Sequence, residues 1–157
     1  MKKIQLSWVL VVILSVVVAI FAYKFTAGAV APSDEGRQAV LISKDERNAL
    51  LLEMRTWLES AQGVLAAANS GDMAKVATIA RVSGMAAEEE TPGSLFAKIP
   101  IAMKTLGFAT RGRFDDMAVM AEEGKSGQEI SAYLADTMNN CIACHAMYTF
   151  VDEATVK

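Results

Sequence analysis

The chain has 157 residues, which is enough for one domain and a targeting segment, and 53% of them are hydrophobic. Residues that favour helices are abundant, Pro occurs only 3 times, and alternating strand patterns are almost absent after residue 30. The net charge is −3, and the only charges before residue 34 are Lys2, Lys3 and Lys24, so the rest of the chain is acidic. We therefore expect an all-α fold, and the acidic surface disfavours nucleic acid as a partner.

An apolar run near the amino terminus extends from Leu6 to Tyr23 and is interrupted only by two serines. As a helix this run would be about 27 Å long, close to the hydrocarbon thickness of a bilayer. Lys2 and Lys3 precede it, which places the amino end in the cytoplasm and sends the rest outward. We therefore predict that residues 1–25 form a single-pass anchor in the bacterial inner (cytoplasmic) membrane, with the domain in the periplasm. A cleavable signal peptide, cut near Ala27–Ala29, is the alternative, and it exports the domain too.

Residues 26–42 mix small, polar, Pro and Gly residues without a helical period, which is typical of a tether. Residues 43–157 are expected to form one domain with four amphipathic helices, the first and last beginning at capping boxes. The predicted helices run from Ser43 to Ser70, from Asp72 to Gly84, from Pro100 to about Glu123, and from Ser126 to Tyr148. The segment 85–99 is expected to be a loop with a turn or two of helix after Thr91. Short connections favour an antiparallel four-helix bundle.

The last predicted helix contains a CxxCH motif, Cys141-Ile142-Ala143-Cys144-His145, which is the attachment signature of c-type haem. On a helix, positions i, i+3 and i+4 share one face, so both thiols and the imidazole point toward one flat macrocycle. The thiols add to the two haem vinyl groups as thioethers, and the imidazole binds the iron. We therefore predict one covalently attached haem c, held by Cys141 and Cys144 with His145 as an axial ligand.

Other interpretations of the two cysteines are weaker. A CxxC redox pair belongs in a strand-to-helix turn of a βαβ unit, whereas this motif lies late in an amphipathic helix. Two cysteines three residues apart in a helix form a disulfide poorly. A zinc site would need a second pair of Cys or His ligands, which the chain does not have.

A four-helix bundle with CxxCH near its carboxyl end resembles the class II c-type cytochromes, the cytochrome c′ group. The resemblance covers about residues 43 to 150, and its more specific pieces are RNALLLEMRTWL, Gly71-Asp72, GRFDDMA and CIACHAMY. It implies an electron carrier or a gas-binding haem protein. The chain departs from the family in its apparent anchor, its short second helix, and Thr149, where the family often has a basic residue.

The sixth ligand of the iron is left open by the sequence. His145 is the only histidine, so the candidates are Met54, another buried Met, or no protein ligand. In the resembling family, the residue four after an arginine of the first helix faces the distal site. Counted from Arg47 this is Leu51, which implies an open or blocked site, whereas Met54 lies one turn further along the same stripe. Candidates for pairing with the haem propionates, or for a solvated surface, are Arg47, Arg55, Arg111 and Arg113.

We therefore expect a mono-haem, membrane-tethered electron-transfer protein on the periplasmic side. It is not expected to be an enzyme, because beyond the haem motif it has no acid/base pair, nucleophile elbow or phosphate loop. The alternatives are a five-coordinate protein that binds NO or CO, and a haem subunit of a larger respiratory complex. The expected partners are redox proteins and the membrane, without nucleic acid, and a homodimer is left open.

Overall fold

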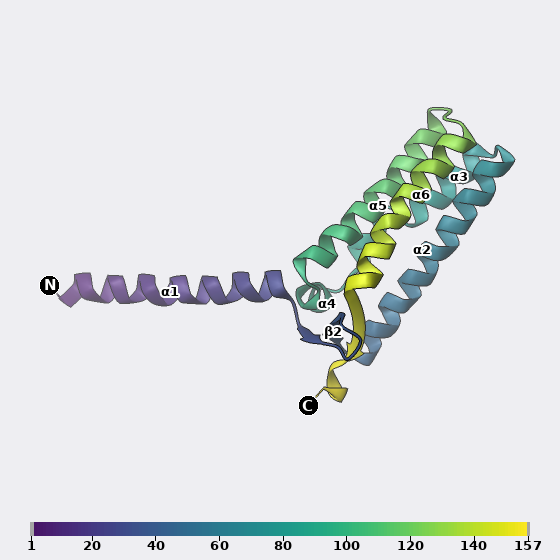
Figure 1. Ribbon diagram of the computed structural model, residues 1–157. Coiled ribbons are helices and arrows are strands. Elements are labelled where there is room, and N and C mark those ends of the chain that lie inside the picture. The colour runs from purple at the N-terminus through teal and green to yellow at the C-terminus, as the bar shows by residue number, and fades with distance from the viewer. Residues whose placement is uncertain (1, 157) are drawn as a thin grey trace.

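The computed structural model describes residues 2–156, and for residues 2–6, 89 and 90 it describes only the backbone. The helices are α1 (Lys2–Ala27), α2 (Lys44–Ser70), α3 (Met73–Val82), α4 (Gly93–Lys98), α5 (Ile101–Glu122) and α6 (Gly127–Met147), with the short 3-10 helices η1 (Met85–Glu90) and η2 (Glu153–Thr155). The strands are β1 (Val30–Pro32), β2 (Gln38–Ile42) and β3 (Tyr148–Asp152). The chain is therefore mostly helical, and Figure 1 shows α1 projecting away from a body made by the other elements.

The projecting helix α1 matches the apolar run at the start of the sequence. Its segment Ser7–Ala27 is long and apolar enough to cross a membrane, and none of it is buried within the protein. A signal sequence has the same two properties. The apolar helix is thus confirmed, whereas the choice between a retained anchor and a cleaved signal stays a prediction.

The helix ends follow the capping residues of the sequence. At the start of α2, the Glu46 amide donates to Ser43 Oγ at 3.2 Å, and the Ser43 amide donates to Glu46 Oε2 at 2.8 Å. Ser126 and Glu129 form the same reciprocal pair at the start of α6. Each such cap stabilises a helix by about 1 kcal/mol, because it satisfies amides that have no partner inside the helix. Both predicted capping boxes are confirmed.

Four helices, α2, α3, α5 and α6, pack side by side in the body of the protein (Figure 1). Both α3 and α6 contact α2 and α5. The helices approach closely where residues are small: a Cβ on Gly127 would lie 2.0 Å from the carbonyl oxygen of Ala68. The larger side chains of the core at this end are Val64, Val76, Phe114, Met117, Ile130 and Leu134. Burying each of them contributes roughly 1.5–3 kcal/mol.

A second core cluster fills the other end of the body, next to the strands. Its members are Val40, Ile42, Leu50, Leu95, Ile99, Met103 and Tyr148. Along α2, residues 51–58 lie between the residues of the two clusters. This stretch of α2 is therefore free to line cavities rather than core.

A small sheet is the main difference from the sequence-based expectation. β2 pairs antiparallel with β1 and parallel with β3. The segment 26–42, which was expected to be an irregular tether, thus contains two strands, and the last helix ends at Met147 instead of continuing into Tyr148. The partners β2 and β3 lie at opposite ends of the domain sequence, so no local pattern reveals their pairing. The helical turn expected after Thr91 is confirmed as α4.

The end of α1 is packed onto the body of the protein. Gly28 follows α1 with a φ of +70°, and a Cβ at this position would lie 2.5 Å from the carbonyl oxygen of Lys98. The ring centroids of Phe25 and Phe96 are 6.2 Å apart, and the Lys104 ammonium lies 3.9 Å from the Phe25 centroid. Only glycine fits such a close approach with a left-handed backbone. The connection between α1 and the domain is therefore a packed junction.

Candidate functional site

The CxxCH motif occupies the last two turns of α6. Cys141 and Cys144 are free, half-buried thiols, and His145 is exposed. Burial raises the pKa of both thiols, and the neighbouring Cys141 adds to the rise at Cys144. A raised pKa keeps the thiols protonated, whereas dithiol redox centres depend on a lowered pKa. The local environment is thus unlike that of a reactive dithiol pair.

Three cavities adjoin the motif, with volumes of about 60, 220 and 380 Å³. Met54 and His145 line all three of them. Cys144 lines the two smaller cavities, and Cys141 lines the smallest and the largest. The apolar walls also include Leu51, Trp57, Leu58, Met103, Leu106 and Phe114. The motif therefore faces mostly apolar space that adjoins α2.

The distal candidates of the sequence analysis lie in these walls. Leu51 lines the two larger cavities, and half-buried Met54 lines all three. Met103 on α5 is a further buried methionine, which the sequence analysis did not single out, and it lines the two smaller cavities. Met117, by contrast, lies in the core cluster at the far end. Met54, Met103 and Leu51 are thus all placed beside the motif.

The four candidate arginines fall into two groups. Arg47 lines the 220 Å³ cavity and Arg55 the 380 Å³ cavity, and both are exposed. Arg113 instead pairs with Asp136. Arg111, only 2% exposed, pairs with Glu53 on another face of α2 and with Glu88 of η1. The structure therefore brings Arg47 and Arg55 to the motif and does not bring Arg111 and Arg113 there.

A fifth arginine, which the sequence analysis missed, contacts the motif. The Nη1 atom of Arg37 donates to the carbonyl oxygens of His145 at 3.0 Å and Tyr148 at 3.2 Å. Arg37 also lines the 220 Å³ cavity. Its place in the expected tether concealed this contact, since the two carbonyl groups belong to the other end of the chain.

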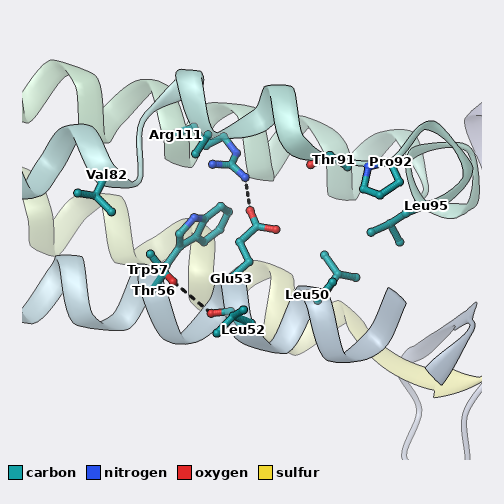
Figure 2. A pocket seen from close by; sticks show the side chains of 12 residues that line it. Leu50, Leu52, Glu53, Thr56, Trp57, Val82, Thr91, Pro92, Leu95 and Arg111 are labelled. Atoms are coloured by element: carbon teal, nitrogen blue, oxygen red, sulfur yellow. Dashed lines mark hydrogen bonds and ion pairs between the residues drawn. The ribbon is translucent and has the colours of Figure 1, made fainter. Parts of the chain in front are cut away.

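A further cavity, of about 410 Å³, is lined by Leu52, Glu53 and Thr56 of α2 and does not reach the motif; Figure 2 shows its walls. Glu53 points into it and pairs with Arg111, whose guanidinium lies 5.3 Å from the Trp57 ring centroid. Glu88 of η1 is the second carboxylate on Arg111, at 2.7 Å. Burial raises the pKa of Glu53, and the Arg111 charge opposes the rise. This cluster ties α2, η1 and α5 together, and it lacks the nucleophilic and metal-binding side chains of the motif.

The arrangement limits the chemistry that the site can support. Among the residues that the structure describes, no group of three or more His, Cys, Asp or Glu is placed to hold a metal ion. Two thiols and one imidazole on a single helical face instead suit a flat ligand that fills apolar space, with a soft sulfur ligand available from α2. Comparisons of the chain with protein-family models, with curated proteins and with solved structures find no match.

Proposed function

We propose that this chain is a mono-haem c-type cytochrome that transfers electrons at the periplasmic face of the bacterial inner membrane. In this proposal the domain is an all-α, antiparallel four-helix bundle of the class II type. The observation that carries it is the CxxCH motif on α6, whose two cysteines and histidine line apolar cavities next to α2.

The residues around the motif fit a covalently attached haem. Cys141 and Cys144 would hold it through thioether bonds and His145 would bind its iron, and the haem would supply a one-electron ferric/ferrous couple. Neither cysteine forms a disulfide within the chain, and burial raises the pKa of both thiols. Apolar walls such as Leu51 and Phe114 would exclude water from the iron and thereby tune its potential.

The distal residue decides between the two leading functions. Met54 lines the same three cavities beside the motif as His145, which favours a thioether ligand and simple electron transfer. Leu51 lines two of the same cavities, and an open site beside it would favour binding of NO or CO. A haem subunit of a larger respiratory complex is a third proposal. In each of them the chain is not an enzyme.

The packed junction supports a retained anchor. Phe25, in the last turns of α1, contributes its ring to a contact with Phe96 of the domain. Cleavage near Ala27–Ala29 would remove this contact, together with the cation–π contact of Lys104 with Phe25. A signal peptide that is discarded has no need of such packing.

The electron-transfer function is tested by redox spectroscopy of the full chain, produced with haem-maturation machinery and purified in detergent. We expect reversible reduction by dithionite and oxidation by ferricyanide, with the sharpened visible bands of a ferrous c-type haem. Exchange of electrons with a second, purified c-type cytochrome should proceed without any added substrate. A haem that is reduced but cannot be reoxidised, or that reacts with NO or CO instead, would contradict electron transfer as the function.

A further inference from the structure

The carboxyl end of α6 presents carbonyl groups that have no partner inside the helix. The amide of Tyr148 donates to the carbonyl oxygen of Cys144 and closes the last helical bond. The carbonyl oxygen of His145 lies beyond this bond, and it accepts from Arg37 Nη1 at 3.0 Å. The same nitrogen donates to the carbonyl oxygen of Tyr148 at 3.2 Å. One guanidinium nitrogen thus bridges the last turn of α6 and the first residue of β3.

Arg37 is itself held firmly. Its Nε atom donates to Glu35 Oε1 at 2.9 Å, and the two side chains form an ion pair. Its carbonyl oxygen accepts from the amide of Ser33 at 3.0 Å and from Ser33 Oγ at 2.7 Å. Gln38, the next residue, is the first residue of β2 and pairs with Tyr148 in the parallel ladder. The Arg37 side chain and strand β2, which follows it, therefore both bind the chain at Tyr148.

A guanidinium at this position suits its task for two reasons. A cation at the carboxyl end of a helix is favoured by the partial negative charge of the free carbonyl groups. The planar guanidinium directs several N–H donors at once, so it can hold two carbonyl groups and Glu35 together, which a lysine ammonium does with less directionality. The carbonyl that it holds belongs to His145, whose side chain is the candidate iron ligand.

We propose that Arg37 is a positioning residue for His145. By fixing the last turn of α6, Arg37 gives the imidazole one orientation toward the iron. The inference rests on the proposed function, because it assigns Arg37 a task at that same haem site. It also assigns a role to the segment before β2, which ties the haem-binding end of α6 to the sheet.

The test uses the full-length holoprotein in detergent, with Arg37→Gln and the conservative variant Arg37→Lys. Arg81→Gln is the control, because Arg81 also forms an ion pair with a glutamate, Glu122, on a different part of the surface. Electron paramagnetic resonance of the ferric protein reports the ligand geometry, and hydrogen exchange of the peptide 140–152 reports the order of the last turn. Circular dichroism confirms that each variant is folded, and Arg37→Lys replaces Arg37→Gln if the latter does not fold.

We expect one ferric species in the wild type and in Arg81→Gln, and a second or broadened species in Arg37→Gln, with partial recovery in Arg37→Lys. Amides of the last turn should exchange about tenfold faster in Arg37→Gln. Faster exchange with an unchanged ferric spectrum would reduce Arg37 to a helix cap and overturn the proposal, as would no change in either measurement. A wild-type chain that binds no haem would overturn the proposed function as well, so the two failures are distinguishable.

Discussion

Met54 and Leu51 lie one turn apart on the face of α2 that lines the cavities beside His145. Their side chains have similar size but different chemistry, since only the Met54 thioether can bind iron. The sequence also predicts Met54 as an inward residue. Because the chain has nine methionines, an inward position alone does not distinguish Met54 as an iron ligand. Its place in the walls of all three cavities is information that only the fold supplies.

Replacement of Met54 by alanine tests the sixth ligand. If Met54 binds the iron, the ferric wild type is low-spin and shows a sulfur-to-iron charge-transfer band, and its ferrous form binds CO poorly. Met54→Ala should abolish the band and open the iron to CO, as measured by absorption spectroscopy with CO titration. Met117→Ala, in the core cluster at the far end, should leave both properties unchanged.

Core packing alone predicts a different outcome for Met54→Ala. The variant would lose about 2–5 kcal/mol of unfolding free energy while the absorption spectrum stayed the same. A wild-type protein that is already high-spin would make Leu51 the distal residue. Binding of NO or CO would then replace electron transfer as the leading function.

At the scale of elements, the helices were predictable from the sequence and the sheet was not. The capping boxes at Ser43 and Ser126 determine helix starts through contacts three residues apart, so a local pattern identifies them. The pairing of β2 with β3 depends on residues from opposite ends of the domain, so no periodicity reveals it. The contact of Arg37 with the motif was missed for the same reason. Likewise, only the structure separates Arg111, held in its own ion-pair cluster, from the proposed haem site.

The junction between α1 and the domain is tested by two glycine substitutions. Gly28 and Gly36 both have positive φ, but only at Gly28 would an added Cβ meet other atoms, 2.5 Å from the carbonyl oxygen of Lys98. Gly36→Ala should therefore cost only about 1 kcal/mol of backbone strain. Gly28→Ala should cost roughly 2–4 kcal/mol, because the junction must also shift.

Urea unfolding of both variants in detergent, followed by circular dichroism, measures this difference in the free energy of unfolding. Limited proteolysis should also cut Gly28→Ala faster between residues 28 and 42. Equal costs for the two substitutions would show that the junction is not a packed contact.

At the scale of the whole molecule, one exposed apolar helix is attached to a mostly helical domain through a packed junction (Figure 1). The proposed haem site lies in the part of the body nearer this junction, since Met103 belongs both to the cavity walls and to the core cluster beside the strands. If α1 is retained, the site is held close to the membrane. The length and composition of the apolar run predicted helix α1. The packed attachment of α1 to the domain depends on contacts between distant residues, which composition cannot reveal.

Retention of α1 is tested by fractionation of cells that express the full chain. The protein should stay with the membrane through a high-salt wash and leave only with detergent, because a span of this length buries enough apolar surface to be effectively irreversible. Amino-terminal sequencing of the purified protein should begin at or near Met1. A mature chain that begins at Val30 or later would show that the segment is a cleaved signal.

Covalent attachment of one haem is the central claim, and the intact mass of the denatured protein tests it most directly. The full-length chain, expressed with haem-maturation machinery, should keep a mass increase of one haem after denaturation, and Cys141→Ala combined with Cys144→Ala should lose it. His145→Ala removes an iron ligand but no thioether bond. Molecules of this variant that have attached the haem should therefore keep it after denaturation, and their absorption spectrum should be altered. A folded wild-type chain that emerges from the same cells with its unmodified mass would contradict the account.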